Sequence, residues 1–284
     1  MRFAPLLAWV NSIAPGAIVM AKPLLPDELW EIIQPLLPSP KPRRFRYPGR
    51  KPIGDRQALT GILFVLKTGI PWEDLPLEMG CGCGMTCWNR LHDWNRAGVW
   101  PRLHQVLLAK LQGADKIDWS RASVDSSFAR ALGGVEGSGK NPTDRGRPGV
   151  KQHTIVEGHG IPLVVDATPA NVPEIKELLP LVESIEPVPG KPGRPKRRPK
   201  KLFGDRAYDS EEHREALRQR GIDPHLAKRK TEHGSGLGKV RWVVERFFSW
   251  LHGFRKLRLV TEKTQEMQFA LLDLATALIC FRFL

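Results

Sequence analysis

The sequence predicts an α/β fold in which a mixed sheet is flanked by helices and preceded by a small, all-α module. Between residues 21 and 115, apolar residues recur at helical spacing in short segments that glycine and proline separate. From residue 116 onward, short apolar runs alternate with amphipathic helices in the order β-β-β-α-β-α-β-α, which is typical of a mixed sheet covered by helices. We therefore expect a helical domain at 21–115 and a sheet-containing domain at 116–284.

Residues 1–20 have two interpretations. Arg2, the apolar stretch 3–10 and the small residues at 14–17 resemble a weak signal peptide. Alternatively, Met20 is the true start and the preceding residues belong to an over-extended reading frame. We favour the second interpretation, because Met20 leads directly into a well-formed first helix, and expect residues 1–20 to be non-native or disordered.

In the helical module we expect helices at residues 27–37, 55–68, 85–94 and 100–111. Asp27 can cap the first helix and Gly69 ends the second. Short helices joined by tight turns suit a helix-turn-helix-like DNA-binding module, although helical bundles without a DNA role have the same pattern. The loop 39–52 contains six basic residues, among them Arg43 and Arg44, and is either a solvated linker or a contact to the DNA backbone.

The second domain should contain five strands and three helices, followed by a packed terminal helix at 269–284. The strands are expected at 121–126, 152–157, 161–166, 201–205 and 222–227, and the helices at 173–185, 211–220 and 240–257. Asp209 and Glu212 suggest a capping box for the helix 211–220. In the helix 240–257 we expect Trp242, Trp250, Phe247 and Phe248 to belong to the core, with stacking on a flipped base as the alternative for Trp250 or Trp242.

A strong excess of positive charge indicates a polyanionic partner. Lys and Arg number 44 against 30 Asp and Glu, for a net charge of +14, and DNA or RNA is the simplest partner for such a chain. The densest basic run is the loop 190–201, which we call the basic loop and which contains Arg194, Lys196, Arg197 and Arg198. Because it directly precedes the strand that ends at Asp205, we expect it near that acid, in contact with the DNA backbone. The alternative is a disordered, solvated loop.

Three carboxylates are candidates for a metal site. Asp125 and Asp205 each end a short, mostly apolar segment, and Glu245 lies on an amphipathic helix beside its apolar face. Acids at the carboxyl ends of strands meet at the rim of a sheet, and converging hard oxygen ligands bind Mg²⁺ or Mn²⁺. With 30 acids in the chain, spacing alone does not select these three; Asp144 and Asp166 are rivals.

Several motifs give these acids a context, because they resemble, in order, the DDE transposases of bacterial insertion sequences, in the insertion-sequence-five branch. The matching segments are residues 69–100 (GIPWEDLP to NRAGVW), 123–126 (SVDS), 141–146 (NPTDRG), 160–163 (GIPL), 203–210 (FGDRAYDS), 241–250 (RWVVERFFSW) and 254–257 (FRKL).

The resemblance implies a ribonuclease H-like catalytic core and divalent-metal phosphoryl transfer, with two Mg²⁺ or Mn²⁺ ions held by Asp125, Asp205 and Glu245. It further implies binding to the terminal inverted repeats of the element and to target DNA. At least a dimer is expected when two ends are brought together. The expected location is the bacterial cytoplasm, at the nucleoid, which suits a chain with four cysteines and no segment that predicts a membrane span.

One basic side chain of the family is present and another is replaced. Arg241 stands one helical turn before Glu245, where it can pair with Glu245 or with a phosphate. Many relatives have a Tyr and a Lys at the positions that Gly238 and His252 occupy here. Arg255 and Lys256 are possible substitutes for that Lys as DNA contacts.

Other functions are weighed against transposition. A structure-selective nuclease would use the same core, and a DNA-binding protein or an inert remnant would need no catalysis, although three intact acids argue against a remnant. The cluster Cys81, Cys83, Cys87 and His92 has a poor spacing for zinc and lacks a second ligand pair.

Overall fold

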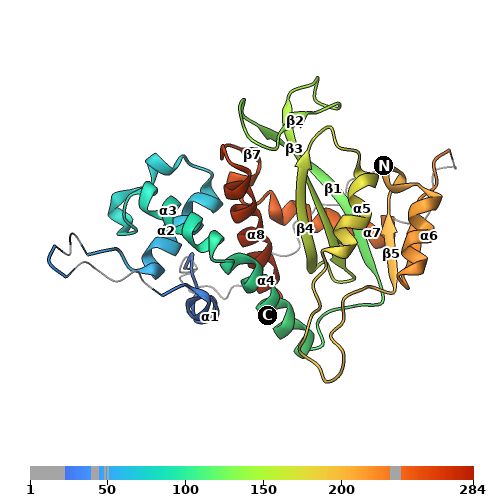
Figure 1. Cartoon of the computed structure of the whole chain (residues 1–284), viewed down its shortest axis with the longest axis horizontal. Coiled ribbons are helices and arrows are strands. Elements are labelled where there is room, and N and C mark those ends of the chain that lie inside the picture. Colours follow the sequence, from blue (N-terminus) through green and yellow to red (C-terminus); the bar gives the residue numbers. More distant parts are fainter. Residues whose placement is uncertain (1–22, 40–44, 48, 50, 231–237) are drawn as a thin grey trace, which may run out of the picture.

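The computed structural model describes residues 23–39, 45–47, 49, 51–230 and 238–284, with only the backbone of Gly238 and Lys239 (Figure 1). The expected extension at residues 1–20 and the candidate DNA contacts Arg43 and Arg44 lie outside the described residues.

The described part of the helical module contains four α-helices, close to where the sequence predicts them. Short 3₁₀ turns lie between some of them. Gly69 ends the second helix with φ 76°, and a Cβ at this position would lie 3.0 Å from the backbone carbonyl carbon of Arg255. The helices are α1 (Asp27–Ile33), α2 (Asp55–Thr68), α3 (Gly84–Arg96) and α4 (Val99–Gly113), and the turns are η1 (Gln34–Leu36), η2 (Trp72–Asp74) and η3 (Leu77–Met79).

The described residues form one mixed sheet whose central strands lie in the order β4-β3-β1-β5-β6. The first three strands in the chain are antiparallel neighbours, whereas the later two run parallel to β1. This order and connectivity is ribonuclease H-like and confirms the predicted fold class. The central strands are β1 (Ala122–Ala131), β3 (Pro148–Glu157), β4 (Pro162–Pro169), β5 (Lys201–Gly204) and β6 (Asp223–Leu226), and two-residue strands β2 (Gly139–Lys140) and β7 (Leu259–Val260) pair with β3 and β1.

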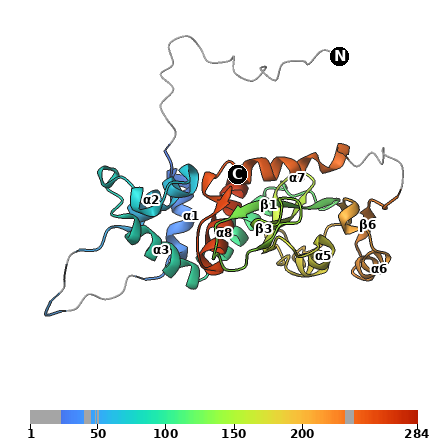
Figure 2. The same ribbon diagram turned by 90° about the horizontal axis from the view of Figure 1, so that it is seen from above.

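Helices cover the two faces of the sheet, as Figure 2 shows: α7 lies on one side, and α5 and α6 lie on the other. The register explains this division, because Asp125 and Gln152 point to the face of α7, while Lys151 and His153 point to the face of α5. The helices of this part are α5 (Glu174–Glu183), α6 (Glu211–Gln219), α7 (Gly238–Leu251) and α8 (Gln265–Phe281), with 3₁₀ turns η4 (Arg206–Tyr208) and η5 (Arg255–Leu257).

One continuous hydrophobic core joins the helical module to the sheet. Leu66 of α2, Trp100 of α4, Phe247 of α7 and Leu274 of α8 are fully buried members of it. In Figure 1, α8 stands between the helical module and β4, and it packs against α3, α4 and β4. Along the described chain, none of the helices combines the length and the apolar character that a membrane span requires.

Two local predictions were wrong in detail. The first strand is ten residues long, so Asp125 is its fourth residue rather than its end. The cap of α6 is Ser210, whose hydroxyl accepts from the His213 amide, because Asp209 is instead paired with Arg214 at 2.6 Å.

Candidate active site

Asp125 of β1 and Asp205, the residue that follows β5, lie side by side. Ala122 and Ser123 of β1 pair in parallel with Leu202 and Phe203 of β5, and continuing this register by two residues places Asp205 beside Asp125. The two aspartates are far apart in sequence but are brought together by backbone pairing.

The two carboxylates are anchored in the same way. Oδ1 of Asp125 accepts the amide of Ser126 at 2.8 Å, and Oδ1 of Asp205 accepts the amide of Ala207 at 2.9 Å. The other oxygens, both Oδ2, face a single nitrogen: Nη2 of Arg241 lies 2.8 Å from the Oδ2 of Asp125 and 4.0 Å from the Oδ2 of Asp205. A cationic group therefore stands where the free oxygens of the pair converge.

Burial sets the electrostatics of this pair. Desolvation raises the pKa of the Asp125 carboxyl, and the neighbouring Asp205 adds to this, while Arg241 and the Ser126 amide oppose it. The Tyr208 side chain is buried, and its pKa is raised well above its usual value by desolvation and by both aspartates. Tyr208, which no sequence pattern singled out, is therefore close enough to the pair for their charges to act on its hydroxyl.

Glu245 lies on α7, one turn after Arg241, and its side chain is exposed. Among the described residues, no group of three His, Cys, Asp or Glu side chains lies close enough together to hold a metal ion. The structure thus brings Asp125 and Asp205 together and leaves Glu245 beside them rather than joined to them. Arg241, which the sequence suggested as a partner of Glu245 or a phosphate, pairs with the two aspartates.

The rival acids have other neighbours. Asp144 forms a two-pronged hydrogen bond with Arg130, at 2.6 and 3.0 Å. Asp166 is paired in register with His153, which is opposite Ser126, so its side chain points to the face of the sheet away from Asp125. Neither acid lies with the Asp125–Asp205 pair.

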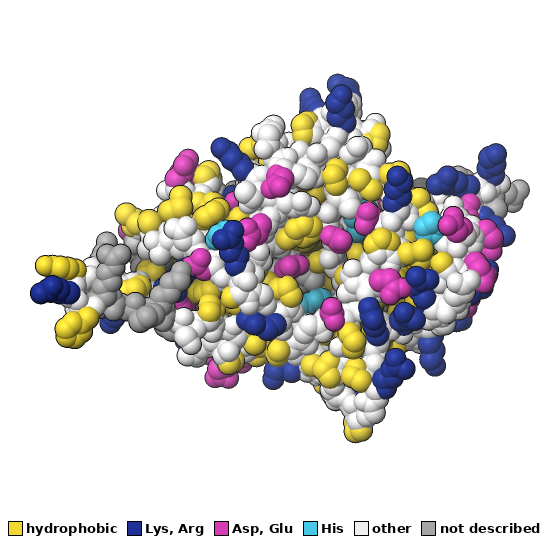
Figure 3. All heavy atoms as spheres, in the orientation of Figure 1, with side chains coloured by type: hydrophobic (Ala, Val, Ile, Leu, Met, Phe, Trp, Pro, Cys, Tyr) yellow, Lys and Arg dark blue, Asp and Glu magenta, His cyan; other side chains and the backbone are white. Residues whose placement is uncertain are grey.

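The basic loop lies at the opposite end of β5 from Asp205, below the sheet in Figure 1. The expectation that it would be near Asp205 was wrong, because the four residues of β5 separate the two by roughly 13 Å of extended chain. Arg197 donates to the backbone oxygens of Glu183 and Ile185, and Arg198 lies 3.7 Å from the Glu183 carboxylate. Arg194 and Lys196 are exposed. In Figure 3, basic side chains gather over this end of the molecule, where α5 and α6 lie.

Two candidate DNA contacts, Arg255 and Lys256, follow α7, and His252 lies just before them. Lys256 is buried, and its ammonium is held 3.2 Å from Glu262, so it faces the interior rather than any bound DNA, and its assignment as a DNA contact was wrong. Arg255 is exposed. His252 lies 3.2 Å from the amide oxygen of Gln152, and burial, with Arg258 nearby, lowers its pKa, which favours the neutral ring.

A second group of basic residues, which the sequence patterns did not single out, follows the carboxyl ends of β5 and β6. Arg206 follows Asp205 directly, and Lys228, Arg229 and Lys230 follow β6, the strand next to β5. The signal was present as the run AKRK after the last strand, where parallel strands place their loops at one rim of the sheet.

The aromatic residues of α7 divide between core and surface. Phe247 and Phe248 are buried as expected, but Trp242 is 48% exposed. The Arg246 guanidinium lies 4.5 Å from the ring centroid of Trp242 and 4.8 Å from that of Trp250. The prediction that Trp242 belongs to the core was wrong, because it extends the exposed side of the helix.

Cys81 and Cys87 are buried, whereas Cys83 is exposed and its hydrogen bond with Thr86 lowers its pKa. Burial raises the pKa of the Cys81 thiol, and it raises that of Cys87 to about 11, which is opposite to what a thiolate ligand needs.

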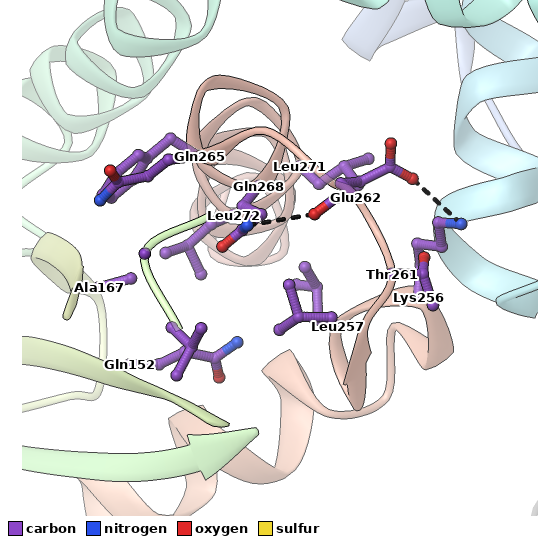
Figure 4. Close-up of a pocket in the computed structure, with 14 residues that line it drawn as sticks. Gln152, Ala167, Lys256, Leu257, Thr261, Glu262, Gln265, Gln268, Leu271 and Leu272 are labelled. Carbon is purple, nitrogen blue, oxygen red and sulfur yellow. Dashed lines mark hydrogen bonds and ion pairs between the residues drawn. The ribbon is translucent and has the colours of Figure 1, made fainter. Parts of the chain in front are cut away.

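The cavity in Figure 4, of about 30 Å³, lies between α8, η5 and the sheet and is lined by residues such as Gln152, Leu257 and Gln268. It holds neither Asp125 nor Asp205.

Comparisons with known proteins show the family of the chain. A family model described as "Putative transposase of IS4/5 family" matches residues 25–104, and one described as "Transposase DDE domain" matches residues 118–280, more than half of the chain. The strand order and the paired acids define a ribonuclease H-like α/β protein. The chain belongs to the IS4/5 family of DDE transposases, and is thus a transposase of an insertion sequence.

Two relatives from Burkholderia cepacia are similar over parts of the chain. The "Insertion element IS402 uncharacterized 16.2 kDa protein" is 65% identical over 123 residues, which cover 43% of this chain and 84% of the relative. The "Putative transposase for insertion sequence element IS402" is 52% identical over 144 residues, which cover 51% and 68%.

Solved structures give a weaker likeness. The Mos1 strand transfer complex is 9% identical, with coverage of 76% of this chain and 78% of that chain and a TM-score of 0.24. A pre-cleavage Mos1 transpososome is 8% identical, with coverage of 85% and 81% and a TM-score of 0.26. The fold assignment therefore rests on the strand order.

Proposed function

We propose that this transposase binds the terminal inverted repeats of its insertion sequence, cleaves the DNA there with the help of divalent metal ions, and joins the freed 3′ ends to target DNA. The observation that supports this best is the convergence of two carboxylate oxygens, from Asp125 and Asp205, on one cation position.

The residues at this position fit a divalent ion. Carboxylate oxygens are the ligands that Mg²⁺ and Mn²⁺ prefer, and the fold already places a cationic group, the guanidinium of Arg241, against them. Asp125 and Asp205 would hold the metal, and Glu245 would complete the set of ligands from α7. Two bound ions would supply activation of the attacking water or 3′-hydroxyl and stabilisation of the leaving oxygen.

The protein holds the two aspartates in a fixed orientation. The backbone amides of Ser126 and Ala207 fix the orientation of the two carboxylates, and such preorganisation is the main contribution a protein makes to phosphoryl transfer. The basic residues around the acids would bind the phosphates next to the cleaved bond. Arg255 and the basic loop, with Arg194, Lys196, Arg197 and Arg198, would bind DNA further away.

We further propose a division of labour in which residues 21–115 bind the DNA ends and residues 116–284 carry the catalysis. At least a dimer is needed to hold two ends in one complex. The reaction would take place at the bacterial nucleoid, where donor and target DNA are found.

The carboxylates are tested by Asp125→Asn, Asp205→Asn and Glu245→Gln in a cleavage assay with labelled terminal repeats and Mg²⁺. Each variant should lose cleavage while fluorescence anisotropy still detects binding of the ends. Asp144→Asn is the matched control, since its carboxylate is paired with Arg130, and it should cleave normally. Cleavage retained by any of the three variants would remove that residue from the site.

A nuclease with the same core would cut but not join. Ends that are already cleaved, with a free 3′-hydroxyl, separate the two functions when they are incubated with a supercoiled target plasmid. Joined products support transposition, whereas nicking without joining supports the nuclease.

A further inference from the structure

The Arg241 guanidinium is held by the acids but is incompletely satisfied. Its Nη2 lies within 4.0 Å of both Oδ2 oxygens, whereas its Nε is buried and has no hydrogen-bond partner among the described residues. A buried donor without a partner carries a free-energy cost. Arg241 therefore neutralises the aspartate pair in a conformation that does not satisfy all of its own donors.

Arg241 and a metal ion would need the same oxygens. The Oδ1 oxygens are already engaged by backbone amides, so the Oδ2 oxygens are the free ligands of each carboxylate. A guanidinium that donates to the Oδ2 of Asp125 at 2.8 Å occupies the position from which a cation would contact it. A metal ion bound there would have to displace Arg241.

A nearby cation stabilises the ionised pair. Two carboxylates side by side repel each other, and the side chain of Asp125 is only 19% exposed, so an uncompensated negative charge there is costly. Arg241, whose side chain is only 19% exposed, reduces this cost when no metal is bound. Once displaced, it would need a new anionic partner.

We propose that Arg241 is a positioning residue that competes with the metal ion for Asp125 and Asp205. A DNA phosphate draws the Arg241 side chain away from the two aspartates, so that DNA and the metal ion bind cooperatively. The proposal rests on the metal site of the proposed function. A phosphate at the rim would accept the guanidinium in a two-pronged hydrogen bond, and Arg206, Lys228, Arg229 and Lys230 lie at the same rim to attract one. The metal site would thus be blocked in the free protein and opened at a DNA end.

Thermodynamic linkage makes the effect measurable. If bound DNA removes Arg241 from the aspartates, it raises the affinity of the protein for the metal ion. The bound metal ion must then raise the affinity for DNA by the same factor. We expect a factor of roughly 10, within the range of about 5- to 150-fold that is typical of coupled sites. Arg241→Gln should bind metal more tightly than the wild type without DNA, and its coupling factor should fall to about 1.

The experiment measures Mn²⁺ binding by electron paramagnetic resonance, with and without a short duplex of the terminal repeat. The proteins are the wild type, Arg241→Gln, Arg241→Lys, and Arg218→Gln as a control. Arg218 is exposed on α6 and pairs with Glu211 and Glu215, so its replacement removes one charge far from the acids. The control should keep the wild-type affinity and coupling, and thermal unfolding verifies that each variant is folded.

The lysine variant separates displacement from simple charge repulsion. Arg241→Lys keeps the charge but has a shorter reach and a single donor group, so it should bind Mn²⁺ more tightly than the wild type without DNA. An affinity equal to that of the wild type would mean that charge alone sets the metal affinity, and would overturn the proposal. Equal coupling in the wild type and Arg241→Gln would also overturn it.

Failure of the proposal is distinguishable from failure of the proposed function. Mn²⁺ binding that disappears in Asp125→Asn establishes the metal site, whatever Arg241 does. If wild type and Asp125→Asn bind Mn²⁺ alike with DNA present, the metal site itself is wrong, and the inference about Arg241 falls with it.

Discussion

The ammonium of Lys256 lies 3.2 Å from a carboxylate oxygen of Glu262, and both side chains are almost completely buried. Glu262 also accepts hydrogen bonds from the indole nitrogens of Trp72, at 2.9 Å, and Trp88, at 3.2 Å. The acid therefore joins three segments that are distant in sequence: η2, α3 and the segment after η5.

Removing this acid should destabilise the whole fold. Glu262→Ala leaves a buried ammonium and two indole donors without partners, and breaking a buried ion pair costs about 3–5 kcal/mol. Urea unfolding followed by circular dichroism measures the change. Asp27→Ala, which removes an exposed partner of Arg56, should cost less than about 1 kcal/mol. Equal effects of the two substitutions would show that Glu262 has no special role.

A second structural prediction concerns Glu157 at the turn between β3 and β4. Its carboxylate is fully buried and accepts the amides of Asp118, at 2.6 Å, His159, at 2.9 Å, and Ile161, at 2.8 Å. Glu157→Ala should lower the free energy of unfolding by roughly 2–4 kcal/mol, since buried amide donors lose their acceptors. Glu215→Ala, on the exposed side of α6, is the control. A similar, small effect for both would argue against the role of Glu157.

Asp273 on α8 should make stability depend on pH. Burial, with a contribution from Asp166, raises the pKa of its carboxyl to about 7, from a usual value of 3.8. A raised pKa means that the folded state favours the protonated acid. The contribution to stability is thus fully present below about pH 4 and is lost as the pH rises through about 7.

Asp273→Asn removes this dependence. The difference in unfolding free energy between Asp273→Asn and the wild type should be larger at pH 8 than at pH 4. We expect this change to favour the variant by on the order of 2–4 kcal/mol, at 1.36 kcal/mol per pKa unit. Unfolding midpoints from pH 4 to pH 8 provide the measurement. Asp74→Asn, at an exposed acid, controls for the general effect of removing a carboxylate, and parallel pH profiles of wild type and Asp273→Asn would contradict the prediction.

The position of the basic loop predicts separate effects on DNA affinity and on catalysis. Replacing Arg194 and Lys196 with Gln should weaken DNA binding irrespective of sequence, and the slope of its salt dependence should fall by about 0.9 for each phosphate that the loop no longer neutralises. Cleavage at saturating DNA should be unchanged, because the loop lies at the opposite end of β5 from Asp205. Lys116→Gln is the control, because the ammonium of this exposed lysine donates to the backbone oxygens of Phe283 and Leu284. Slower cleavage by the loop variant at saturating DNA would place the loop closer to the chemistry.

The order of elements could be predicted from the sequence because it depends on local patterns. Helix α2 was predicted at the same residues that it occupies, since its buried face repeats regularly and Gly69 marks its end. The same is true of the succession of strands and helices after residue 116, where short apolar runs alternate with amphipathic helices. The length of β1 was missed because Ser126, Ser127 and Arg130 make its second half polar, and pairing with β3 rather than hydrophobicity keeps it extended.

The composition of the site was partly predictable. The resemblance selected Asp125 and Asp205, and the structure places them together. The pairing of Arg241 with these acids was not foreseen, since sequence spacing on a helix indicates Glu245 as its partner, whereas the tertiary packing of α7 against β1 brings Asp125 closer. The burial of Lys256 was also unforeseen, because its partner Glu262 lies beyond the helix in a segment without a periodic pattern.

The shared core of the helical module and the sheet affects the distance between the DNA sequence that is bound and the bond that is cleaved. Since α8 packs against both α4 and β4, we expect the module to move together with the sheet that carries Asp125. A DNA end gripped by the module would be cut at a fixed number of base pairs from the gripped sequence. The protein would thus act as a molecular ruler, with its length set by the packing around α8.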